Sequence, residues 1–318
     1  MKTAESVSPM HPDKICDRIS DAVLDACLEQ DEFARVAIET MGGHGIITIT
    51  GELSTTANVD IRRVAQSIVG NKYGIQVNVV KQSEEIAGGV DTGGAGDQGI
   101  MIGYATDETE ELLPKEVVLS RNLNRYVFGI YPYDGKTQVT VNDDGTVSAI
   151  VCSWQNVERE ELETIVRQWA TGININKDFK VLANPAGDWE IGGFEADTGL
   201  TGRKLAVDNY GPSIPVGGGC YSGKDPSKVD RSAAYMARRI AVDYLRGRHA
   251  HEVFVRLAYA IGYDQPVEAT VIVDGKPEAV EGYDLTPNGI IDVLNLRQPI
   301  YKETAEFGHY GNGFVWDI

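Results

Sequence analysis

The chain has 318 residues, of which 29 are Lys or Arg and 47 are Asp or Glu, so its formal net charge is −18 with neutral histidines. So acidic a surface repels nucleic acids and anionic membranes, because both are bound through patches of basic residues. We therefore expect neither as a partner. With 42% hydrophobic and 24% charged residues, the chain is expected to fold as a globular protein of roughly two or three domains.

Neither a membrane helix nor a secretion signal is visible in the sequence. No apolar run approaches the roughly 18 residues that span a membrane, and the start, Met-Lys-Thr-Ala-Glu-Ser, lacks the apolar stretch of a signal peptide. Cys16, Cys27, Cys152 and Cys220 form no C-x-x-C pair, so we expect reduced thiols. These features predict a cytoplasmic protein.

A strand, turn, strand, helix pattern occurs three times along the chain. The helices are recognised by apolar residues at three- and four-residue spacing, and the strands by β-branched runs that flank turn residues. The three copies comprise 35–40, 46–50 and 61–68; 137–141, 146–151 and 162–169; and 252–261, 268–273 and 290–294. This order predicts three similar α+β domains of the β-β-α type.

Two further helices are predicted outside the repeat, over 13–28 and 230–245, from apolar positions at helical spacing. Each begins beside a short charged motif. Backbone amides and the helix dipole favour phosphate at such a position.

The segment 192–223 contains nine glycines in 32 residues and fits neither a regular helix nor a regular strand. From 199 to 231 there are five basic and three acidic residues, a local charge of +2 in a chain of −18. This reversal indicates an anionic ligand. Two motifs of nucleotide-binding proteins are incomplete: the G-x-G-x-x-G at 94–99 lacks the flanking strand and helix, and the G-x-x-x-x-G-K at 218–224 is followed by Asp225.

Four clusters combine basic and acidic side chains. They lie at 11–14, 134–136, 201–204 with Asp197 just upstream, and 224–230. A polyphosphate bound with magnesium needs both signs, because Lys and Arg neutralise the phosphate oxygens while carboxylates hold the metal. The alternative interpretation is a set of solvated surface ion pairs.

These motifs resemble those of the S-adenosylmethionine synthetases, or methionine adenosyltransferases, over nearly the whole chain. The segments that carry the resemblance are ESVS (5–8), HPDK (11–14), ISDAVLD (19–25), GAGDQG (94–99), GLTGRK (199–204) and GGGCYSGKDPSKVDRSAAY (217–235). The resemblance implies an α+β fold of three similar domains related by pseudo-threefold symmetry. We expect them at 1–99, 100–191 and 192–318, with segments exchanged across these boundaries.

The resemblance also implies the reaction. The sulfur of L-methionine attacks the ribose 5′-carbon of ATP and displaces the whole triphosphate, which is then hydrolysed to pyrophosphate and phosphate. Sulfur is already a good nucleophile, so such an enzyme must mainly position it and stabilise the departing charge. Two Mg²⁺ ions per site and K⁺ are the implied cofactors. The implied assembly is a homodimer with active sites between subunits, and pairing into a tetramer is left open.

Site residues follow from the resemblance position by position. The catalytic set is His11, Lys136, Arg203, Lys204 and Lys224. The ATP-binding set is His11, Lys14, Asp134, Lys136, Asp188, Trp189, Asp197, Arg203, Lys204, Cys220 and Lys224. The methionine-binding set is Glu52, Gln82, Asp97, Asp197 and Lys228. The metal ligands are Asp13 and Asp230 for magnesium and Glu39 for potassium.

The chain departs from the family pattern at several positions. Met10 replaces the glycine before the histidine, and Asp188 replaces an arginine before the aromatic residue expected to stack on adenine, Trp189. The loop 82–97 is shortened after Asp91, which should alter turnover more than chemistry. Two alternatives to an active synthetase are a magnesium-dependent triphosphate hydrolase and an inactive regulatory homologue.

Overall fold

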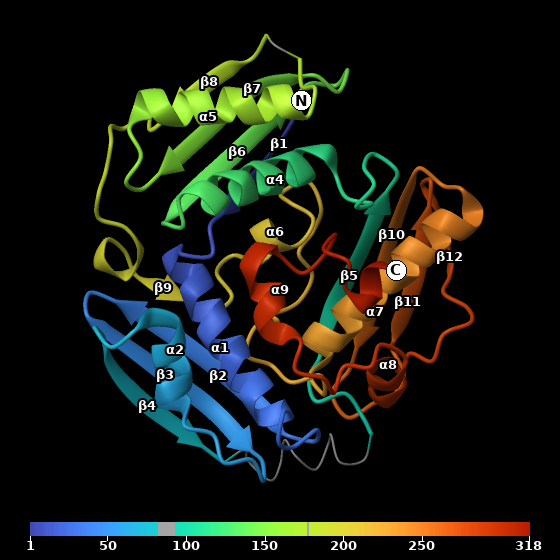
Figure 1. Ribbon diagram of the computed structural model, residues 1–318. Helices are drawn as coiled ribbons and strands as arrows, with labels where there is room; N and C mark the ends of the chain where they lie inside the picture. Colours follow the sequence, from blue (N-terminus) through green and yellow to red (C-terminus); the bar gives the residue numbers. More distant parts are fainter. Residues whose placement is uncertain (82–92, 177) are drawn as a thin grey trace.

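The computed structural model of the chain describes residues 1–81, 93–176 and 178–318, so Gln82 lies outside the described residues. Strands of the described residues form three four-stranded sheets. The sheets surround a centre that contains α1 (Pro12–Leu28), α4 (Lys115–Ile130), α7 (Val229–Arg248) and α9 (Tyr301–Phe307) (Figure 1). The predicted α+β fold of three similar units is confirmed.

Each unit consists of a long helix, two antiparallel strands and a second helix. The first has α1, β2 (Arg35–Gly43), β3 (Ile46–Ser54), α2 (Ile61–Val69) and β4 (Gly74–Val80). The second has α4, β6 (Gly135–Val141), β7 (Val147–Trp154), α5 (Arg159–Gly172) and β8 (Lys180–Ala183). The third has α7, β10 (Glu252–Tyr259), β11 (Glu268–Val273), β12 (Lys276–Ala279) and α8 (Pro287–Val293). Each predicted strand pair and helix is found in its place.

The third unit differs from the other two in its last strand. β4 and β8 each follow the second helix and run parallel to β3 and β7. β12 instead precedes α8 and forms an antiparallel hairpin with β11, through a turn in which Asp274 and Gly275 have positive φ. The pseudo-symmetry is therefore closest between the first two units.

The remaining strand of each sheet comes from another part of the sequence. β1 (Lys2–Val7) pairs with β6, β5 (Gly99–Thr106) with β10, and β9 (Gly199–Leu200) with β2, all antiparallel. Long-range strands of this kind tie the units together. The boundaries after residues 99 and 191 stay a proposal about sequence segments.

Helix α1 shows how sequence determines local structure. His11 caps its N-terminus and Pro12 occupies the first turn, where the missing amide costs nothing. Ile15, Ile19 and Val23 recur on one stripe and are buried. The helix packs on β2 of its own sheet and on α9, the small C-terminal helix. The predicted range 13–28 is thus correct to within one residue.

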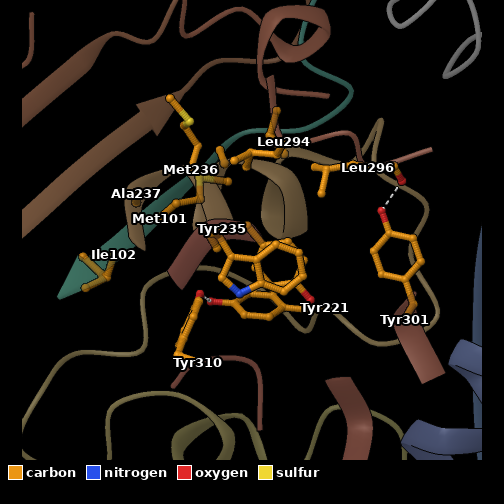
Figure 2. Packing of buried hydrophobic residues seen from close by; sticks show 14 of the residues in the cluster. Met101, Ile102, Tyr221, Tyr235, Met236, Ala237, Leu294, Leu296, Tyr301 and Tyr310 are labelled. Atoms are coloured by element: carbon orange, nitrogen blue, oxygen red, sulfur yellow. Dashed lines mark hydrogen bonds between the residues drawn. The ribbon is translucent and has the colours of Figure 1, made fainter. Parts of the chain in front are cut away.

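Aromatic side chains fill the centre of the molecule. Tyr235 of α7 lies together with Tyr221 and Tyr310 (Figure 2). Trp316, in the last turn η2 (Val315–Asp317), stacks on Tyr235 with ring centroids 3.7 Å apart. Ring stacking adds to the burial of the apolar area, so the C-terminal segment forms part of the core.

All four cysteines belong to the described residues and are free. Cys16, Cys27 and Cys152 are buried, as expected for small apolar side chains. Among the described residues, none of the helices has both the length and the apolar character that a membrane crossing requires.

The buried His309 should make stability depend on pH. Burial, with Arg231, Lys14 and Arg121 nearby, lowers the pKa of His309 well below its usual value, so the folded protein keeps it neutral while the unfolded chain protonates near pH 6.5. The free energy of unfolding of the wild type should therefore fall, relative to that of His309→Gln, by about 1.4 kcal/mol for each pH unit below pH 6.5. Urea unfolding of both proteins from pH 8 to 5 measures this, and a constant difference would contradict it.

Candidate functional site

The first charged cluster surrounds the N-terminus of α1. The backbone N–H of Asp13 donates to Nδ1 of His11 at 3.2 Å. Burial, together with the nearby Lys204 and Lys136, lowers the pKa of His11 to about 3. The imidazole is therefore neutral, and because Nδ1 accepts a hydrogen bond, its proton resides on Nε2. His11 thus offers an N–H donor without a positive charge.

Asp13 joins this cluster to the segment 201–204. Its side chain accepts hydrogen bonds from the backbone N–H of Leu200 at 2.9 Å and from Nζ of Lys204 at 2.5 Å, and Nε of Arg203 lies 3.5 Å away. Burial by itself would raise the pKa of Asp13, but the bonds from Lys204 and Leu200 lower it overall. Two clusters far apart in sequence meet here as a buried carboxylate with two basic partners.

A second carboxylate–lysine pair lies at the start of α7. Nζ of Lys224 lies 2.6 Å from Oδ2 of Asp230, and the backbone N–H of Gly219 donates to Oδ1. A Cβ atom on Gly218 would lie 3.1 Å from both Oδ1 of Asp230 and the carbonyl oxygen of Ile100. The glycines therefore let the backbone approach this carboxylate closely.

The cluster at 134–136 lies near His11. Asp134 accepts the backbone N–H of Gly193 at 2.9 Å, and burial raises the pKa of Asp134. Lys136 on β6 is exposed, and the electrostatic effects of Lys136 and Asp197 on His11 bring both into the same neighbourhood. A cavity of about 300 Å³ opens beside Asp134, lined in part by Met10.

Trp189 is half-buried at a second hollow, of about 310 Å³, whose walls also include Glu158, Asp188 and Glu190. The Asp188 carboxylate accepts a hydrogen bond from the Asn184 amide at 3.3 Å. The position at which the sequence departs from the family thus adds negative charge to an already acidic rim.

The two glutamates expected to bind potassium and methionine lie on neighbouring strands. Glu39 on β2 pairs with Thr50, and Glu52 on β3 pairs with Ala37. The backbone of Lys224 forms an isolated bridge to Ala37, and β9 pairs at Met41. Glu39 therefore lies on β2 between Ala37, which contacts the segment of Lys224, and Met41, which contacts the strand that precedes Lys204.

The remaining predicted site residues have different environments. Asp97 is exposed, and Lys228 is paired with Asp225 at 2.5 Å. Burial raises the pKa of Cys220 to about 12, so it is a thiol whose Sγ contacts the carbonyl oxygen of Ser222.

Lys14 requires a correction. The sequence places it among phosphate-binding residues, but its side chain is fully buried and its Nζ contacts Asp17 at 3.1 Å and Asp208 at 2.5 Å. Burial opposes its charge, yet the two carboxylates raise the pKa of Lys14 overall. The Lys14 side chain is inaccessible and its charge is already balanced by two buried carboxylates, so an incoming phosphate does not reach it and we leave it out of the proposed site.

Asp17 and Asp21 are not among the site residues that the sequence predicts. Both are buried on α1, and each accepts a backbone N–H from a glycine, Gly202 and Gly223 respectively. The signal that could have revealed them is the four-residue spacing of aspartates in the segment 13–25.

The donor set suits a hard cation bound together with phosphate. No group of three His, Cys, Asp or Glu side chains in the described ranges is arranged around a common metal position. Magnesium is commonly held by one or two carboxylates, with substrate phosphates and water as its other ligands. Asp13 and Asp230, each a single carboxylate beside lysine, fit that pattern.

Fold and site together define an α+β protein of three similar units, with a neutral histidine beside one carboxylate–lysine pair at the start of α1 and a second such pair at the start of α7. Models of the N-terminal, central and C-terminal domains of S-adenosylmethionine synthetase match residues 1–84, 92–189 and 191–318. Two S-adenosylmethionine synthases, from Petrotoga mobilis and Treponema denticola, are 39% and 42% identical to the chain, covering 99% of it and 95% of each relative. The chain belongs to the S-adenosylmethionine synthetase family.

The alignments with these two relatives are longer than this chain. They run over 381 and 369 positions, more than the 318 residues of this chain. Each relative therefore has residues within the matched region for which this chain has no counterpart.

Proposed function

We propose that this chain catalyses the reaction for which its family is named, the formation of S-adenosylmethionine from ATP and L-methionine. The observation that carries the proposal is a pair of carboxylate–lysine contacts, that of Asp13 with Lys204 beside the neutral His11 and that of Asp230 with Lys224 at the start of α7. A triphosphate needs cations, and its metal needs carboxylates. The two contacts supply both the cations and the carboxylates.

The carboxylates and lysines would exchange partners when substrate binds. Lys204, Lys224, Arg203 and Lys136 would hold phosphate oxygens, which frees Asp13 and Asp230 for magnesium, two ions per site. Magnesium, when bound, would supply charge neutralisation at the phosphate oxygens. The exchange preserves the charge balance around each buried carboxylate, so neither is left unpaired.

His11 would donate Nε2–H to the oxygen at which the triphosphate departs. The methionine sulfur forms a bond to the ribose 5′-carbon while the bond from that carbon to its oxygen breaks, and the electron pair leaves with the triphosphate. Water then cleaves the bound triphosphate to pyrophosphate and phosphate. A neutral donor stabilises the developing charge without requiring proton transfer beforehand.

The other predicted residues complete the site. We assign Asp134 to the nucleoside, with Trp189 and Asp188 near the base, and Cys220 to the rim of the ATP site. Methionine would bind near Glu52, Gln82, Asp97, Asp197 and Lys228. Potassium would bind at Glu39. Because ATP is a cytoplasmic metabolite, we place the protein in the cytoplasm.

We propose that a second copy of the chain covers one face of sheet β4-β3-β2-β9. Helices α1 and α2 lie against the opposite face (Figure 1). The proposed face exposes apolar side chains around Glu39 and Glu52, namely Met41, Ile46, Val80 and Leu200. Exposed apolar surface next to a functional site is typical of an interface. Sedimentation velocity tests this homodimer, and a monomer at assay concentrations would contradict it.

The activity is tested by incubating the pure protein with ATP, L-methionine, Mg²⁺ and K⁺. We expect the sulfonium product by mass spectrometry, with pyrophosphate and phosphate in equal amounts. Removing magnesium with EDTA should abolish the reaction, since the phosphate charge would be unneutralised. Phosphate release that ignores methionine would favour a triphosphate hydrolase, and a protein with neither activity would favour an inactive homologue.

A further inference from the structure

Helix α1 carries an aspartate at every fourth position, Asp13, Asp17, Asp21 and Asp25. This spacing places the four side chains along one stripe of the helix. The first three are buried, and the fourth is half-buried. Four carboxylates in a row repel one another, so their arrangement requires compensating partners.

Each aspartate accepts a backbone N–H from a segment distant in sequence. The bonds to Asp13, Asp17 and Asp21 come from Leu200, Gly202 and Gly223, at 2.9, 2.8 and 2.8 Å. Asp25 accepts from Tyr301 and Lys302, the first residues of α9, at 2.9 and 2.8 Å. We call these four residues the α1 aspartate row.

The two middle aspartates have buried cations as partners. Lys14 contacts Asp17, and Arg231 binds Asp21 through two bonds of 2.7 and 2.9 Å. All four of these side chains are nearly or fully inaccessible. The carboxylates of Asp17 and Asp21 therefore point at backbone amides and not at solvent.

The glycines that Asp17 and Asp21 hold come directly before the basic residues of the proposed triphosphate site. Gly202 precedes Arg203 and Lys204, and Gly223 precedes Lys224. Both glycines have positive φ, +86° and +80°. These turns have little freedom, because a Cβ on Gly202 would lie 2.5 Å from the Cβ of Cys220 and one on Gly223 would lie 1.9 Å from the carbonyl oxygen of Ile38.

We propose that Asp17 and Asp21 are positioning residues, which fix the turns at Gly202 and Gly223 and thereby direct Lys204 and Lys224 toward the triphosphate. The inference rests on the proposed function for the identity of the ligand. Charge-assisted bonds to a backbone amide are stronger than neutral ones. They hold the lysine-bearing turns in place before substrate arrives, so less ordering entropy is lost on binding.

Asp25 provides a matched control, since it lies on the same row and accepts two backbone amides but holds α9 instead of a lysine-bearing turn. The probe is inorganic tripolyphosphate with Mg²⁺, measured by titration calorimetry on the full chain. We expect Asp17→Ala to weaken its binding at least about tenfold and to raise KM for ATP. Asp21→Ala should do the same through Lys224. Asp25→Ala should lower Tm yet leave the affinity within about twofold of wild type.

Asp17→Asn is the second variant in case Asp17→Ala does not fold. It keeps the side-chain volume and an oxygen for the Gly202 amide, so affinity should fall only about two- to fivefold. The inference is overturned if Asp17 variants bind tripolyphosphate as wild type does, or if Asp17 and Asp25 variants weaken binding equally. A wild-type chain that binds tripolyphosphate but makes no sulfonium would contradict the proposed function while leaving this positioning role standing.

Discussion

Replacing Lys204 with methionine should lower kcat/KM for ATP by about 100- to 1000-fold, the usual cost of removing one preorganised group that stabilises developing charge. The Nζ of Lys204 lies 2.5 Å from Oδ2 of Asp13, a buried carboxylate. Without the lysine, the phosphates lose a cation and Asp13 loses its main partner, so both substrate binding and the departure of the triphosphate become less favourable. Initial rates of sulfonium formation over a range of ATP concentrations measure the effect.

Lys276→Met is the control for this variant. Lys276 is an exposed residue of β12, in another sheet from the Asp13 cluster, so its loss removes the same charge from the chain without touching the site. It should keep kcat/KM within about twofold, because isolated surface charges contribute little. Equal effects of the two substitutions would show that Lys204 acts only through the net charge of the chain.

Arg231→Met should reduce the free energy of unfolding by about 3–5 kcal/mol, because it leaves the Asp21 carboxylate buried without its cation. Arg231 is fully buried and binds both oxygens of Asp21, the carbonyl oxygen of Lys224 and the hydroxyl of Tyr235. Its guanidinium also lies 4.2 Å from the ring centroid of Tyr301. Urea unfolding followed by tryptophan fluorescence measures the loss.

The double variant Asp21→Asn with Arg231→Met separates the unpaired charge from the lost packing. Removing the carboxylate as well should restore part of the stability lost in Arg231→Met, because no buried charge remains unpaired. If the losses in unfolding free energy of the two single variants add up to that of the double variant, Arg231 contributes through its packing alone.

The strand, turn, strand, helix repeat could be predicted because its signals are local. The turn of 42–45 and the apolar stripe that includes Ile61 and Ala65 lie within a few dozen residues and need no distant partner. The same holds for α1, whose cap, proline and apolar stripe lie within one segment. Charged residue types likewise indicated a metal and phosphate ligand before any geometry was known.

Contacts between distant segments could not be predicted in this way. That β1 joins the sheet of β6 follows from pairing across more than a hundred residues, which no periodicity records. The environment of Lys14 is of the same kind, since Asp208, one of its two carboxylate partners, lies 194 positions away. A charged sequence motif does not show whether its lysine is buried or exposed.

By itself, then, the sequence determined the three β-β-α units and the helices beside the charged motifs, because propensity, capping and amphipathic spacing act over short ranges. It also supplied the residue types of the proposed site. Only the tertiary structure decided which carboxylate faces which cation. It brought Asp13 to Lys204, buried Lys14 and turned Asp17 and Asp21 toward the glycine turns. The physical reason is that the strength of a charge pair depends on burial and on separations of a few ångströms, and packing sets both.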